Sequence, residues 1–81
     1  MTTKEFNEML GPLLHKYKYP CFHRAINKIV FGKHYKGIRK TATPDQIADI
    51  LITYETCRSL IMTGYNEEEL LTTLKNHKQN D

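Results

Sequence analysis

Helix start and stop signals divide this sequence into four segments, and they constrain its fold more than any other feature. Thr2 and Glu5 have the Thr-x-x-Glu spacing of a capping box, in which each side chain satisfies a free backbone N–H at a helix start. An apolar stripe at three- and four-residue steps follows: Phe6, Met9, Leu10, Leu13 and Tyr17. At Gly11 and Pro12 either this helix kinks or Pro12 begins a second short helix, and we expect the kink because the stripe keeps its phase across them.

Capping residues, prolines and glycines mark the ends of the other three helices as well. Pro20 suits a first helical position and Gly32 a left-handed terminus, which predicts a second helix over about residues 20–31. The third helix should begin with Thr43 as cap, Pro44 at the first position and Gln46 completing the box, and should stop at Gly64. Asn66 should cap a fourth helix, with acids in its first turn and leucines inside: Glu67, Glu68, Glu69, Leu70, Leu71 and Leu74.

Between the second and third helices, residues 32–43 show no helical apolar period and contain two glycines. We interpret this segment as a basic loop that could hold a short irregular turn. The sequence therefore predicts an all-α fold, a small single-domain bundle of about four helices over residues 1–81.

The apolar runs are too short to cross a bilayer, and the N-terminal residues have no apolar stretch typical of a signal peptide. We expect a cytoplasmic protein without a membrane partner. Cys21 and Cys57 are far apart, so we expect two reduced thiols rather than a disulfide framework.

Charge is segregated along the chain. Residues 1–40 hold nine Lys or Arg against two acids (+7), and residues 41–81 hold three against seven (−4), which together give the net charge of +3. No Asp or Glu lies between Glu8 and Asp45. A stretch of one sign this long attracts polyanions or an acidic protein surface.

The basic stretch also carries tyrosines, and this combination is typical of proteins that bind phosphate backbones and stack on bases. We therefore expect a small nucleic-acid-binding protein, DNA-binding in particular, with an accessory or regulatory role. Phosphate contacts are expected from Arg24, Lys28, Lys33, Lys36, Arg39 and Lys40, and base or stacking contacts from His23, Asn27 and Tyr35.

The alternative is a protein-interaction module, an adaptor or inhibitor that docks on an acidic partner and is encoded by a phage or mobile element. On the third helix the predicted main stripe is Ile47, Ile50, Leu51, Tyr54, Cys57 and Ile61. Ile52 and Leu60 point to nearly the opposite side, which fits either a homodimer interface or contact with the first or fourth helix. Arg58 also lies on the main stripe. Either it lies along the edge of the core and pairs with an acid such as Glu55, or it contacts a partner protein.

No catalytic signature is present, so we expect no enzyme and no cofactor. His15, Cys21, His23 and His34 lack the paired spacing of zinc ligands, and we expect no metal site. A helix-turn-helix over Gln46–Ile61 is not favoured, because the apolar stripe continues through the position where the turn would lie.

Overall fold

The computed structural model describes residues 1–77 of the chain, and over these residues it is all-helical with no strand. The elements are α1 (Thr3–Leu10), the 3₁₀ turn η1 (Gly11–Leu13), α2 (Tyr19–Phe31), the 3₁₀ turn η2 (Ile38–Thr41), α3 (Pro44–Met62) and α4 (Glu67–His77). The predicted all-α fold of four helices is confirmed.

Local capping explains where the helices begin and end. Both predicted capping boxes are present, at Thr2 for α1 and at Thr43 for α3, and Asn66 exchanges the same pair of hydrogen bonds with Glu69 at the start of α4. Gly32 ends α2 in the left-handed conformation with φ of 76°, which a side chain would make costly.

The predicted kink at Gly11 and Pro12 is wrong, because α1 ends at Leu10 and a short 3₁₀ helix that contains Pro12 follows it, close to the alternative of a second short helix. Gly11–Leu13 form a single 3₁₀ turn, and Leu14 leaves it in an extended conformation with ψ of 111°. Pro12 cannot donate a helical hydrogen bond, so the chain has no reason to resume the helix there. Tyr17 is therefore part of a connector between α1 and α2 rather than of the first helix.

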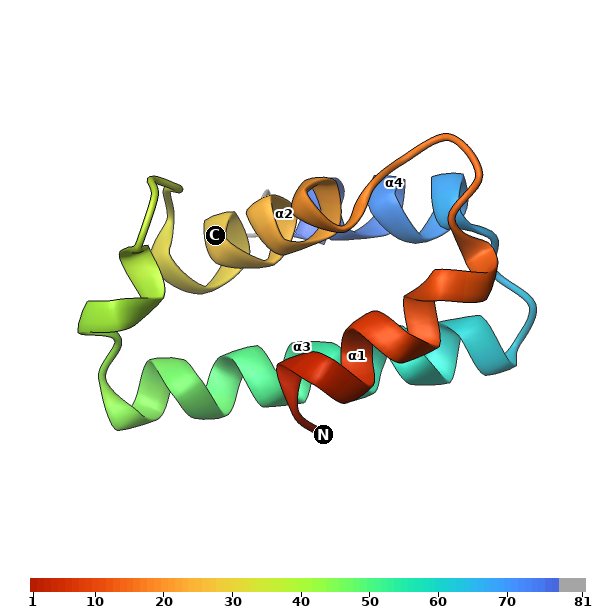
Figure 1. Ribbon diagram of the computed structural model, residues 1–81. Coiled ribbons are helices and arrows are strands. Elements are labelled where there is room, and N and C mark those ends of the chain that lie inside the picture. Colours follow the sequence, from red (N-terminus) through yellow and green to blue (C-terminus); the bar gives the residue numbers. More distant parts are fainter. Residues whose placement is uncertain (78–81) are drawn as a thin grey trace.

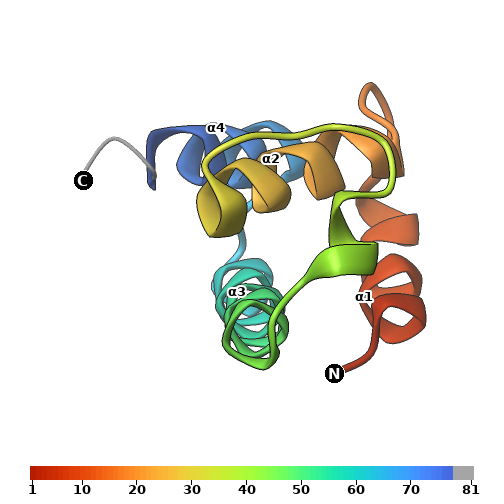
Figure 2. The ribbon, with the colours of Figure 1, turned by 90° about the vertical axis from the view of Figure 1, so that its left-hand side faces the viewer.

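The four helices form two layers, with α2 beside α4 in one layer and α1 beside α3 in the other (Figures 1 and 2). One cluster of buried side chains joins them. At its centre Phe6 of α1 stacks on Tyr54 of α3 with ring centroids 4.3 Å apart. The loop between α2 and α3 closes one end of the bundle, and the other two connectors lie at the opposite end (Figure 1).

Glu67 ties the connector after α1 to the start of α4. Its carboxylate accepts hydrogen bonds from the backbone N–H groups of His15 (2.8 Å), Lys16 (2.8 Å) and Tyr17 (3.4 Å). Burial raises the pKa of Glu67, but these three N–H donors and the His15 charge outweigh it, so the pKa lies below its usual 4.5. This side chain thus orders a segment that has no helix of its own.

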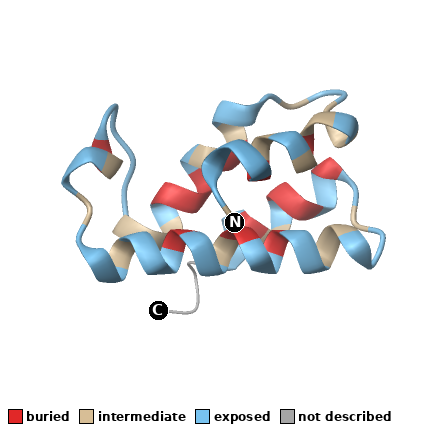
Figure 3. Cartoon of the chain, turned by 60° about the horizontal axis from the view of Figure 1, so that its bottom comes forward, coloured by how far each residue is buried: buried red, intermediate tan, exposed pale blue. Residues whose placement is uncertain are grey.

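The outer face of α3 differs from the prediction. Ile50, Tyr54 and Cys57 are buried as expected, but Ile47 is 48% exposed and Leu51 39% exposed. The other helices cover only one side of α3, so its far side stays open to solvent (Figure 3). The stripe predicted as one buried face is therefore divided between the core and the surface.

Within residues 1–77, the structure contains no helix with the length and apolarity needed to span a membrane. Cys57 is buried and Cys21 half-buried, and both thiols are free.

Candidate nucleic-acid interface

Arg39 is the centre of a hydrogen-bond network at the loop end of the bundle. Gly37, with φ of 81°, turns the chain into η2, and buried Ile38 anchors that turn in the protein. The next residue, Arg39, then points back toward α2 and α3. Its guanidinium donates from Nε to Asn27 Oδ1 (2.6 Å) and from one terminal nitrogen to Tyr54 Oη (2.6 Å).

The network extends to α1 and to the rest of the loop. Tyr54 Oη also shares a hydrogen bond with Thr3 Oγ1 (3.1 Å), and Asn27 Nδ2 lies 3.0 Å from His34 Nδ1. Because Asn27 Oδ1 already accepts from Arg39, its amide nitrogen donates to His34. One side chain from the loop thereby links three helices.

His23 completes this network in its neutral form. The second terminal nitrogen of Arg39 donates to Nδ1 of His23 at 3.3 Å, so the ring proton is on Nε2, which donates to Asn7 Oδ1 at 2.7 Å. Burial, followed by the nearby charge of Arg39, lowers the pKa of His23 from 6.5 to about 4. Both ring nitrogens are thus engaged inside the protein.

This arrangement predicts an unusual titration. In an NMR titration the imidazole of His23 should protonate with a midpoint near pH 4. Between pH 6.5 and 4 the unfolded chain binds a proton that the folded protein does not, so stability should fall as the pH drops through this window. A midpoint at 6.5 or above would show that the ring is not held in the network.

Five of the nine residues predicted to bind nucleic acid surround one open pocket of about 420 Å³ between α1, α2 and the loop: His23, Asn27, Tyr35, Arg39 and Lys40. Asn27, however, is only 5% exposed and does not lie on a solvent-facing surface as the helical pattern suggested. The loop folds back over that side of α2, and Arg39 and His34 take the hydrogen bonds of the amide. A base-reading role for Asn27 in this conformation would require those bonds to break.

The remaining predicted residues are exposed. Arg24 and Lys28 line a shallow groove of about 180 Å³ between α2 and α4, together with Lys75 from α4. Lys33 and Lys36 lie in the loop, where the Lys33 ammonium is 5.9 Å from the ring centre of Tyr35, itself 50% exposed. The predicted cations therefore occupy the loop and the side of α2 that faces the groove with α4.

Within residues 1–77, these cations form no ion pair. In the described part of the chain the ion pairs are Arg58 with Glu55 and the N-terminal ammonium with Glu55, and neither involves a residue between 16 and 40. Even Arg39 bonds only neutral partners, although it is partly buried. Among the described residues, the acids of the second half of the chain therefore form no ion pair with the cations of residues 16–40.

The residues predicted as a partner interface are separated by the structure. Ile52 is 62% exposed and Leu60 is half-buried, and both line a pocket of about 290 Å³ formed by α2, α3 and α4. Arg58 is exposed on another side of α3 and pairs with Glu55 at 3.2 Å. The predicted ion pair with Glu55 is present, but it lies at the surface and not at the core edge.

Sequence reasoning missed the residues that hold Arg39 in place. The helical pattern places Tyr54 only on the apolar stripe and indicates no role for Thr3 or Asn7, although all three contact the network or line its pocket. Lys75 was missed because it lies in the acidic half of the sequence, yet the fold brings it beside Arg24. A tyrosine hydroxyl on a buried stripe was the one available signal, since such a group needs a partner.

Among residues 1–77, no three His, Cys, Asp or Glu side chains lie close enough together to hold a metal ion. Comparisons of the chain with models of protein families, with curated proteins and with solved structures found no match.

Proposed function

We propose that this protein binds nucleic acid through the phosphate backbone, using the exposed cations of α2 and of the loop that follows it. The observation that carries the proposal is the absence of ion pairs at these cations within the described residues, while Arg58 on α3 is paired. An unpaired surface cation is free to neutralise a phosphate and release its condensed counterions.

Exposed residues and residues with internal hydrogen bonds have different roles in this proposal. The exposed side chains contact phosphates, namely Arg24, Lys28, Lys33, Lys36 and Lys40. Tyr35, half exposed beside Lys33, stacks on a base or donates to a phosphate. His23, Asn27 and Arg39 are occupied internally, so they act mainly by fixing the loop against α2.

Such an interface recognises charge and shape more than sequence, because the amide and imidazole that could read base edges are turned inward. We therefore expect similar affinity for duplexes of different sequence. We also expect a strong dependence on salt, since about five phosphate contacts lose roughly 500-fold in affinity between roughly 50 and 200 mM salt.

The test is the binding of a labelled duplex and a labelled single strand, measured by fluorescence anisotropy across a salt series. Lys36→Gln should weaken binding to every sequence and reduce the slope of log K against log salt by about 1. The matched control is Lys18→Gln, which removes an exposed cation in the connector between α1 and α2, at the end of the bundle opposite the loop (Figure 1).

Two results would overturn the proposal. One is no measurable binding at about 50 mM salt, where about five phosphate contacts suffice for detection. The other is an equal loss for Lys36→Gln and Lys18→Gln, which would indicate a diffuse charge effect. In the first case the same cations would be better explained by an acidic protein partner, and recovery of a defined protein from nuclease-treated lysate would support that alternative.

A further inference from the structure

The face of α3 that the other helices leave open carries several large apolar side chains. Ile47, Leu51, Ile52 and Met62 are 48%, 39%, 62% and 75% exposed, and all four lie on this one helix. Leu51 and Met62 lie on one side of the helix with Glu55 and Arg58 between them, and Ile47 and Ile52 lie on either side of that line. Large exposed apolar side chains concentrated on one helix indicate an interaction surface.

The spacing of residues along this face is that of a helix-pairing seam. Ala48, Leu51, Glu55, Arg58 and Met62 follow one another at intervals of three, four, three and four residues. All five are exposed in the structure. This alternation is the spacing of the a and d positions through which two helices pack together, with charged residues in place of apolar ones at the two central positions.

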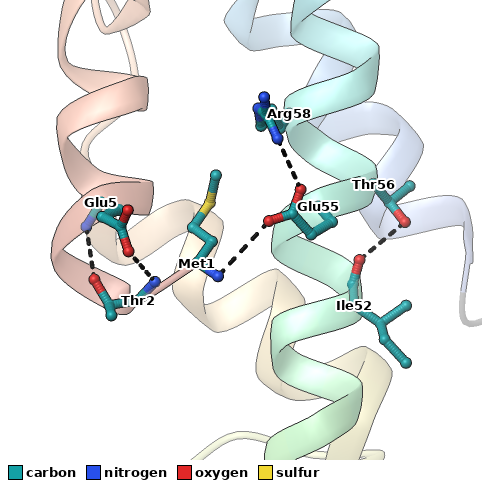
Figure 4. A network of polar contacts seen from close by, with 7 residues as sticks. All are labelled: Met1, Thr2, Glu5, Ile52, Glu55, Thr56 and Arg58. Carbon is teal, nitrogen blue, oxygen red and sulfur yellow. Dashed lines mark hydrogen bonds and ion pairs between the residues drawn. The ribbon is translucent and has the colours of Figure 1, made fainter.

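Two charged residues occupy the centre of this seam and have opposite signs. Glu55 is 48% exposed and Arg58 is 54% exposed, and they form an ion pair on the surface of α3 (Figure 4). The N-terminal ammonium of Met1 lies 3.7 Å from the same Glu55 carboxylate. The apolar positions Leu51 and Met62 flank the charged pair, one on each side along the helix.

This order of residues is complementary to itself only in one orientation. When two copies of α3 run antiparallel about a twofold axis between positions 56 and 57, Glu55 faces Arg58 of the second copy and Leu51 faces its Met62. When they run parallel and in register, Glu55 faces Glu55 and Arg58 faces Arg58, so both pairs of facing residues repel. A face that matches its own copy under a twofold axis is the requirement for a symmetric dimer.

We infer that the outer face of α3 is a homodimer interface, in which two antiparallel α3 helices pack through Leu51 and Met62 and exchange ion pairs between Glu55 and Arg58. The core side of α3, with Tyr54 and Cys57, stays within each subunit. Because the interface consists of one helix face, it forms a reversible dimer that depends on concentration.

Charge reversal tests this geometry directly by sedimentation equilibrium at micromolar to millimolar concentrations. Wild type should form a dimer. Glu55→Arg and Arg58→Glu should each be monomeric, since each places like charges opposite one another in both central layers. An equimolar mixture of the two variants should recover a dimer, because every facing pair in the mixed species is then opposite in sign.

The mixing experiment separates the interface from effects within one chain. Both single variants break the internal Glu55–Arg58 pair, and mixing cannot restore that pair inside either chain. Recovery on mixing would also show that each variant is folded. Glu68→Arg, at an exposed position of α4, is the matched control and should remain dimeric.

A second variant removes apolar contact without changing charge. Leu51→Gln should weaken the dimer of wild type and of the mixed species alike. The inference is overturned if wild type is monomeric throughout the concentration range, which would leave the face to a different protein. It is also overturned if either charge-reversed variant remains dimeric, or if the mixture stays monomeric.

Discussion

Replacing Arg39 with methionine is expected to destabilise the protein by about 2–4 kcal/mol, because it leaves several buried or partly buried polar groups without a partner. Asn27 Oδ1, Tyr54 Oη and His23 Nδ1 each accept a hydrogen bond from the guanidinium. Methionine keeps much of the apolar stem of arginine but supplies no donor. Thermal denaturation should show a drop in Tm of roughly 10–20 °C for a domain of this size.

The neighbouring lysine provides the control for this experiment. Lys40 is exposed and lines the same pocket, so Lys40→Met removes the same charge and should change stability by no more than about 0.5 kcal/mol. Arg39→Lys should recover little, because an ammonium cannot donate in the three directions that the guanidinium uses. A melting temperature of Arg39→Met close to that of Lys40→Met would contradict the structural role of the network.

A double-mutant cycle with Tyr54→Phe identifies the hydrogen bond itself. The single Tyr54→Phe change removes a hydroxyl that bonds both Arg39 and Thr3, and the ring is fully buried. In the Arg39→Met background the same change should lower the free energy of unfolding by less, because the main partner of the hydroxyl is already gone. We expect a coupling energy of about 1 kcal/mol. Additive effects would mean that the two side chains do not interact in solution.

The helices were predictable from sequence because their signals are local. Thr43 and Gln46 lie within one turn of each other, and Gly32 acts through its own backbone conformation. Pro12 shows the limit of such signals, since a proline in phase with an apolar stripe is compatible with a kink or with a helix end. The extended conformation of Leu14 decides between them, and that depends on how the connector is held.

The interior of the candidate site was not predictable in the same way. Asn27 lies on the polar side of its helix, and only the return of the loop, twelve residues later at Arg39, makes that side an interior. The helical pattern of α3 likewise groups Ile47 with Tyr54, but the neighbouring helices reach only Tyr54. Both outcomes depend on which surfaces the loops bring together, and periodicity carries no information about that.

The cations of residues 16–40 form no ion pairs within the described part of the folded chain, and the sequence suggests why. Most acids of the chain lie in α3 and α4, where Glu69 bonds the backbone N–H of Asn66 at the start of α4 and Glu67 bonds the connector after α1. Acids committed to helix caps and connectors are less free to pair with lysines of another helix. The segregation of charge along the chain therefore persists as a set of unpaired cations among the described residues.

Glu67→Gln is the second change with a large expected effect, because one carboxylate holds the whole connector between α1 and α2. Its two oxygens accept three backbone N–H groups, with His15 and Tyr17 on one oxygen and Lys16 on the other. Glutamine offers one oxygen and places an NH₂ group where the second was, so at least one N–H meets another donor. We expect Tm to fall by roughly 10 °C, and amide hydrogen exchange at residues 15–17 to accelerate.

Acid should reproduce the effect of this substitution in the wild type. The folded pKa of Glu67 is below 4.5, so its carboxylate stabilises the fold above the ordinary pKa, and this contribution is lost as the pH falls through the lower folded value. Glu68→Gln, at an exposed position in the same helical turn, is the control and should follow the wild-type pH profile. Glu67→Gln should instead lose less stability than wild type as the pH falls below 4.5, since it has no carboxylate at this position to protonate. Parallel profiles for Glu67→Gln and wild type would mean that the connector is held by packing alone.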